Sequence, residues 1–144
     1  MREPSIMVTV EQLQAMIADV PFVSWLGVTI LDVEEGFCRA RLPYNDQHLQ
    51  YYRLIHGGVI ASFADTMVYM AQATLNGITL NTVTTNLAVT YLSTARQEDL
   101  YAESRILKNG SKVIYGDVSL TDPSGRQIAH ATATYLRLDY VMRK

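Results

Sequence analysis

One carboxylate stands inside an apolar stretch of this 144-residue chain. Between Val59 and Ala73 most residues are small or apolar, and Asp65 is the only charged one. Burying an unpaired carboxylate is costly unless the group is paired or neutralised. Such a group is a candidate nucleophile or general base. A structural aspartate that accepts hydrogen bonds from backbone or hydroxyl donors explains Asp65 equally well, so both interpretations stay open.

The residues His56, Gly57 and Gly58 precede the same stretch. Glycines in the first turn of a helix let a ligand approach the backbone, whose N–H groups are free at this end. A helix N-terminus is also electropositive, so it suits an anion or a polarised carbonyl. For a glycine pair taken alone, a tight turn that requires glycine is the better explanation. Asp65 downstream shifts the balance toward a binding site.

The spacing of these residues adds a constraint. Asp65 follows Gly57 by eight residues, which in a helix separates them by roughly 12 Å. One reacting bond cannot contact both comfortably. If both act on one bond, one of them comes from a second subunit, and an antiparallel pair of these helices across a two-fold axis would supply it. The spacing therefore predicts a homodimer, or a homotetramer built from such dimers.

Two helices are predicted, and the second contains Gly57 and Asp65. Apolar residues at helical spacing predict a helix over about residues 10–20, which a capping box of Thr9 and Gln12 begins. Residues 21–27 are expected to form a packed turn. The apolar stretch predicts a long helix over about residues 57–75, and a helix that is apolar nearly all round is buried.

Strands are predicted on both sides of the long helix. Period-two alternation and turn residues, among them an Asn109-Gly110 hairpin in which both residues accept positive φ, mark six of them. They span residues 28–33, 37–42, 83–91, 100–108, 111–121 and 127–138. We therefore expect one α+β domain over residues 1–144, in which an antiparallel sheet wraps around one long central helix.

The composition excludes several functions. A net charge of −2 without a long single-sign run gives no support for binding nucleic acid or anionic membranes. Cys38 is the only cysteine, so a disulfide and a Cys-based zinc site are excluded, and a reducing cytoplasm suits this usage. No histidine and carboxylate cluster suggests another metal. No signal peptide is expected, because residues 1–8 lack an apolar run. No membrane span is expected either, because Asp65 and Gln72 interrupt the most apolar stretch.

The run from His56 to Asp65, HGGVIASFAD, resembles the signature of hotdog-fold acyl-CoA thioesterases of the phenylacetyl-CoA (PaaI-like) group. The chain is also similar to the medium- and long-chain acyl-CoA branch. The resemblance covers about residues 22–138. It implies a hotdog fold and a hydrolase that releases free acid and coenzyme A from acyl-CoA at sites in a dimer interface. Coenzyme A is then part of the substrate, and no cofactor is implied.

The resemblance also implies roles for individual residues. The Gly57 N–H would polarise the thioester carbonyl as half of an oxyanion hole. Asp65 of the partner subunit would attack the carbonyl or activate a water, and both routes stay open. His56 would orient the thioester or its loop. Thr84 would position the water, although a β-branched strand residue explains it equally well. Substrate contacts are expected from Gly58, Tyr51, Tyr52, Asn86, Gly110 and Lys112.

One position departs from the family pattern. Many relatives carry an asparagine six residues before the histidine, where this chain has Gln50, and the bulky Tyr51, Tyr52 and Arg53 follow. The longer amide either fills the catalytic role of that asparagine or is a solvated loop residue. In the second case the two tyrosines shape the pocket, and with it the acyl group that is accepted.

Several other residues are weaker candidates for a functional role. His48 and His130 are expected at the surface or a sheet edge rather than as ligands, and Cys38 as an unreactive strand residue. Solvated charge is a better interpretation than contact with phosphates for the basic residues Lys108, Lys112, Arg126 and Arg137.

Two other functions remain: a hotdog hydratase or dehydratase, and a non-catalytic acyl-CoA-binding protein.

Overall fold

The computed structural model of the chain describes residues 8–78 and 81–139. The expected order of one helix, two strands, a long helix and four strands is confirmed, and α2 and a short 3-10 helix, η1, are added to it. The elements are α1 (Val10–Ala18), α2 (Pro21–Leu26), β1 (Thr29–Glu34), β2 (Phe37–Leu42), η1 (Asp46–His48), α3 (Gly57–Asn76), β3 (Thr82–Tyr91), β4 (Leu100–Asn109), β5 (Val113–Thr121) and β6 (Gln127–Arg137).

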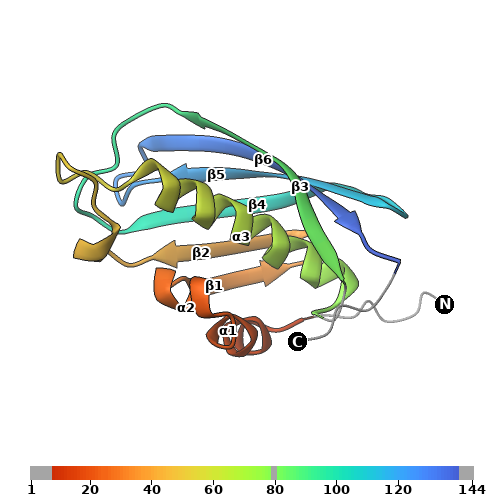
Figure 1. Ribbon diagram of the computed structural model, residues 1–144. Helices are drawn as coiled ribbons and strands as arrows, with labels where there is room; N and C mark the ends of the chain where they lie inside the picture. The colour runs from red at the N-terminus through yellow and green to blue at the C-terminus, as the bar shows by residue number, and fades with distance from the viewer. Residues whose placement is uncertain (1–7, 79–80, 140–144) are drawn as a thin grey trace.

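The six strands form one antiparallel sheet in the order β1-β2-β4-β5-β6-β3, and α3 lies along one face of it (Figure 1). Small residues on that face let the helix come close. A Cβ on Gly116 of β5 would lie only 3.1 Å from Cγ1 of Val68 on α3. On β6, Ala129, Ala131 and Ala133 are buried in the same layer. The predicted antiparallel sheet around one long helix is therefore confirmed.

The long helix has one side that the sheet does not cover. Twelve of the 20 residues of α3 are buried, and the helix ends at Gly77, whose φ is 84°. A stripe at helical spacing stays only partly buried and consists of Ala61, Ser62, Asp65 and Tyr69. The expectation of burial all round is thus corrected along this stripe, on which the candidate carboxylate lies.

One edge of the sheet is formed by β3, which pairs with β6 alone. Most of its residues are exposed, and a strand at an edge has unpaired backbone N–H and C=O groups along one side. Its pairing with β6 is shifted by a β-bulge between Thr84 and Asn86. A bulge adds one residue to one strand, so the side chains beyond it change faces.

The N-terminal segment differs in part from the prediction. The Thr9–Gln12 capping box of α1 is confirmed, with both of its hydrogen bonds present. The segment expected as a packed turn instead forms the short helix α2. Pro21 is its first residue, where the fixed φ of proline favours a helix and its missing N–H costs nothing. The two helices lie beside β1 (Figure 1).

The β4–β5 hairpin forms, but with a different turn from the predicted one. Neither Asn109 nor Gly110 adopts a positive φ. The strands end at Asn109 and resume at Val113, and the Gly110 N–H donates to the Val113 carbonyl at 2.9 Å. Glycine is required there for space, because a Cβ would lie 2.7 Å from that same carbonyl oxygen.

Candidate active site

The carboxylate of Asp65 is held by two hydroxyl groups from the sheet. Thr84 Oγ1 donates to its Oδ1 at 2.9 Å, and the Tyr135 hydroxyl lies 2.8 Å from the same oxygen. The Tyr135 hydroxyl also lies 2.5 Å from the Asp65 backbone carbonyl. The charge is therefore paired with neutral donors rather than with a cation, and no salt bridge to Asp65 is found among the described residues.

Strand register explains why these two hydroxyls reach one carboxylate. Thr84 on β3 and Tyr135 on β6 are opposite each other in the antiparallel pairing, so their side chains share a face. That face points to α3, where Tyr135 is 4% exposed. Sequence reasoning named Thr84 but missed Tyr135, because strand periodicity does not determine which residues of two strands are paired.

A cavity of about 270 Å³ lies next to Asp65. Its polar lining residues come from α3 and the sheet, whereas its apolar wall comes largely from the two N-terminal helices. The lining residues are Met16, Ile17, Val20, Val23, Asp65, Thr66, Tyr69, Met70, Thr84 and Tyr135. A carboxylate at the wall of an apolar cavity suits a substrate with a polar reacting group and an apolar tail.

The start of α3 is capped by the histidine that precedes it. His56 Nδ1 accepts a hydrogen bond from the Gly58 N–H at 2.7 Å, and the His56 carbonyl accepts from Val59 at 2.9 Å. Gly58 must be small, because a Cβ there would lie 2.9 Å from His56 Nδ1. The Gly57 N–H is the one donor of this first turn for which the described part of the chain provides no acceptor.

A second cavity, of about 400 Å³, lies beside Gly57. Tyr91 at the end of β3 covers the glycine: its hydroxyl donates to the Gly57 carbonyl at 2.6 Å. The other lining residues are Gln50, Leu54, Ile55, Ile60, Leu92, Ser93, Thr94 and Ala95. Gly57, whose N–H is free, thus lines a partly apolar cavity, which suits a donor to a polarised carbonyl.

Gln50 lines this second cavity, whereas its two tyrosine neighbours do not. The Gln50 side-chain oxygen accepts from the Tyr52 N–H, which leaves the NH₂ group without an acceptor among the described residues. Tyr51 and Tyr52 are 90% and 76% exposed and pack edge to face on each other. The placement favours the amide over the tyrosines as a contact of a bound thioester.

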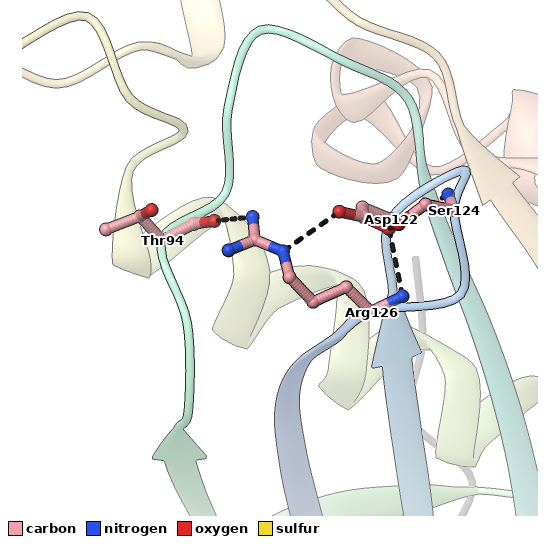
Figure 2. A network of polar contacts seen from close by, with 4 residues as sticks. All are labelled: Thr94, Asp122, Ser124 and Arg126. Carbon is pink, nitrogen blue, oxygen red and sulfur yellow. Dashed lines mark hydrogen bonds and ion pairs between the residues drawn. The ribbon is translucent and has the colours of Figure 1, made fainter.

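Polar side chains in the turn between β5 and β6 hold one wall of the second cavity in place. Figure 2 shows Arg126, which donates to the Thr94 carbonyl at 2.7 Å and to Asp122 at 3.1 Å. Asp122 also accepts from the Ser124 hydroxyl at 2.6 Å. Next to Thr94, the Ala95 carbonyl accepts from Ile55, the residue before His56. Arg126 is thus occupied with protein acceptors, unlike a solvated surface charge.

Three further expected substrate contacts, Asn86, Gly110 and Lys112, also lie outside both cavities. The β-bulge places Asn86 opposite Thr134, on the sheet face that points away from α3. Gly110 and Lys112 lie in the β4–β5 turn. That turn is tied to the far end of α3 by a hydrogen bond of 2.9 Å between Asn76 and Asn109. Within one chain, none of the three is brought to Asp65 or Gly57.

The remaining candidates are placed as follows. His48 was expected at the surface but is 2% exposed; it packs against Trp25, and its burial lowers its pKa. His130 lies partly exposed, 3.2 Å from Asp117. Burial, reinforced by the charge of Asp32, raises the pKa of Cys38 to about 12, so its thiol stays protonated and unreactive at neutral pH.

No three His, Cys, Asp or Glu side chains in residues 8–78 and 81–139 lie close enough together to hold a metal ion. No helix in the same residues is both long and apolar enough to cross a membrane.

The fold and the site define a class of protein. The sequence matches the thioesterase superfamily over residues 52–129, more than half of the chain, and the chain belongs to this superfamily and has its hotdog fold. It is an enzyme, a hydrolase that acts on thioester bonds.

Three similar proteins illustrate the range of the family. A candidate esterase from Halobacterium salinarum is 31% identical over 125 residues, which cover 83% of this chain and 82% of that protein. The medium/long-chain acyl-CoA thioesterase YigI from Salmonella typhimurium is 29% identical, and the match covers 92% of this chain and 98% of YigI. The structure of Escherichia coli PaaI, a protein from the phenylacetic acid degradation operon, is 21% identical with a TM-score of 0.80, covering 92% of this chain and 95% of PaaI.

Proposed function

We propose that this enzyme hydrolyses acyl-CoA, with Asp65 and Gly57 acting on the same thioester from two different chains. The observation that supports this most directly is a partly buried carboxylate, held by Thr84 and Tyr135 at the wall of an apolar cavity, on the central helix of a thioesterase. The YigI relative, named for medium- and long-chain acyl-CoA, supports the choice of substrate.

The reaction requires one donor and one base or nucleophile at the carbonyl. The Gly57 N–H stabilises the negative charge that develops on the carbonyl oxygen. Asp65 takes a proton from an attacking water, or attacks the carbonyl itself. On the first route the water oxygen bonds to the carbonyl carbon, the C–S bond breaks, and the thiolate of coenzyme A leaves and takes up the proton held by Asp65. On the second route the Asp65 oxygen bonds to the carbon as the thiolate leaves, and water then hydrolyses the acyl-aspartate anhydride, which releases the free acid, restores the carboxylate and supplies the proton for the thiolate. His56 holds the first turn of α3, and the Gln50 NH₂ group donates to the thioester.

A homodimer is part of the proposal, because the two groups lie in separate cavities of one chain. The cavity at Gly57 and the cavity at Asp65 share no lining residue. The partly exposed stripe of α3 and the exposed edge strand β3 are both available to a second copy. Antiparallel pairing of two α3 helices would bring each Asp65 toward Gly57 of the partner subunit. Two such dimers can associate further into a tetramer.

The apolar cavity next to Asp65 is proposed to hold the acyl group. Met16, Val20 and Val23 form its wall on the side of α1 and α2. The acyl tail then lies under the N-terminal helices, while the coenzyme A portion points out of the protein.

A cytoplasmic location is also proposed, since the single, buried thiol of Cys38 suits a reducing compartment.

A thiol-release assay on a panel of acyl-CoA substrates, from acetyl to palmitoyl and including phenylacetyl, tests this function. Release of free thiol from saturated substrates is the expected result. Tight binding of acyl-CoA without thiol release would instead identify a non-catalytic binding protein. Addition of water to an enoyl-CoA with the thioester left intact would identify a hydratase.

A further inference from the structure

Tyr135 is a buried residue with its hydroxyl against the candidate catalytic carboxylate. It is 4% exposed, and its hydroxyl oxygen lies 2.8 Å from Asp65 Oδ1 and 2.5 Å from the Asp65 carbonyl. Nothing in the motif from His56 to Asp65 points to it, since it lies 70 residues later, on β6.

The single hydroxyl proton of Tyr135 lies between two oxygens of the same residue. Both are acceptors, and the carboxylate is the stronger one because it is charged. The contact to the carbonyl fixes the position of the tyrosine relative to the helix backbone, and the contact to Oδ1 fixes the carboxylate relative to the tyrosine. Together they restrict rotation of the Asp65 side chain.

Thr84 completes the arrangement from the opposite strand. Its hydroxyl donates to the same atom, Oδ1, at 2.9 Å. Oδ1 therefore has two donors, whereas Oδ2 has none among the residues that the structure describes. Of the two carboxylate oxygens, Oδ2 is the one left with its lone pairs available to a water or a carbonyl.

We propose that Tyr135 is a positioning residue of the active site, which together with Thr84 holds Asp65 Oδ1 and thereby makes Oδ2 the reacting oxygen. The inference rests on the proposed function of Asp65. It adds a residue from the last strand to a site otherwise built from α3, the loop before it and β3.

The state of Tyr135 is consistent with a permanent donor. Burial, followed by the negative charge of Asp65, raises its pKa far above the ordinary value of 10.0. The hydroxyl therefore keeps its proton at neutral pH and acts as a donor rather than as a base.

Tyr135→Phe tests the proposal, because it removes the hydroxyl and keeps the ring. A carboxylate that is free to rotate is less often in the attacking geometry, so kcat should fall by roughly ten- to a hundredfold with little change in KM. Tyr44→Phe is the matched control: it deletes another tyrosine-to-aspartate hydrogen bond, to Asp46, outside the site. It should leave both constants unchanged.

A double-mutant cycle separates positioning from a merely structural role. If Tyr135 acts through the carboxylate, Tyr135→Phe should have no further effect on the residual rate of Asp65→Asn. A loss of equal size in both backgrounds, or wild-type kcat in a folded Tyr135→Phe protein, would overturn the proposal. If Tyr135→Phe fails to fold, Thr84→Val takes its place, because the second donor to Oδ1 must show the same dependence on Asp65.

The same assays distinguish a wrong role for Tyr135 from a wrong proposed function. If the wild-type protein releases no thiol from any acyl-CoA, the proposed function is wrong. If the wild type is active and the Tyr135→Phe protein is equally active, only the role of Tyr135 is wrong.

Discussion

At the scale of single residues, the activity is expected to depend most on Asp65. Asp65→Asn keeps the size of the side chain but removes the charge. We expect the variant to fold and bind acyl-CoA, with kcat lower by about a hundredfold or more, as for the loss of a general base. Steady-state kinetics together with a thermal melt checks this. Near wild-type turnover by a folded variant would show that Asp65 is structural.

Gln50 offers a second test at this scale. Its free NH₂ group lies at the cavity beside Gly57, whereas Tyr51 and Tyr52 point into solvent. Gln50→Ala should lower kcat/KM by roughly ten- to a hundredfold, the value of one hydrogen bond to a partly charged group. Gln50→Asn should retain much of the activity. Kinetics on two acyl chain lengths decides between the amide and the tyrosines. If kcat/KM of Gln50→Ala is unchanged on both substrates and Tyr51→Ala shifts the preferred chain length, the tyrosines shape the pocket and Gln50 has no catalytic role.

Single residues also show what the sequence could and could not predict. Asp65 and the His56-Gly57-Gly58 run stood out by their isolation and their spacing, and the structure places both along α3 as expected. Tyr135 could not be found in this way, since its role depends on which residue of β3 lies opposite it. His48 was misplaced at the surface, because its packing against Trp25 joins two segments that have no pattern in common.

At the scale of elements, periodicity predicted the long helix and the strands well, because each has many residues on one repeat. It failed for α2, whose six residues are too few to show a repeat. It also missed the bulge in β3, because Thr84 and Thr85 are the same residue type, so the change of phase between them does not show in the sequence.

The two N-terminal helices are expected to control the acyl chain length. Val23→Phe places a ring in the cavity of about 270 Å³ next to Asp65. The value of kcat/KM should fall by at least about tenfold for long acyl chains and little for short ones, since only the long ones need that space. Ala15→Phe, at an exposed position of α1 outside the cavity, is the control. An equal effect on all chain lengths would place the acyl group elsewhere.

The turn before β6 gives a prediction for acid stability. Hydrogen bonds from the Ser124 hydroxyl and then from Arg126 hold the pKa of Asp122 at about 2, below the ordinary value of 3.8. A carboxylate whose pKa is lower in the folded state stabilises the fold above its unfolded pKa and loses that contribution as the pH falls through the folded value. Thermal melts between about pH 5 and pH 2 should therefore show Asp122→Asn less stable than wild type at the upper end, with the difference shrinking toward the lower end. A difference that does not depend on pH would contradict the assignment.

At the scale of the whole molecule, shared sites predict complementation. Gly57→Pro removes the N–H at a position where a helix accepts proline, and Asp65→Asn removes the carboxylate. In a mixed dimer one site has both defects and the other has neither. Equal mixing with full subunit exchange should restore about a quarter of the wild-type rate, because half of the dimers are mixed and each has one intact site of two. No recovery after demonstrated exchange would locate each site within one chain.

The β-bulge after Thr84 has a consequence for insertions and deletions. Thr84 and Tyr91 are separated by an odd number of residue steps, so in a strand without a bulge their side chains would face opposite ways. With it, both Thr84 and Tyr91 face α3, so the strand contacts Asp65 near one end and Gly57 at the other. Deletion of Thr85 would remove the bulge and leave an even number of residue steps between the two, so a regular strand would keep both side chains on the face toward α3. We therefore expect deletion of Thr85 to be tolerated better than deletion of a residue from the regular part of β3, such as Ala88, which would turn Thr84 or Tyr91 outward.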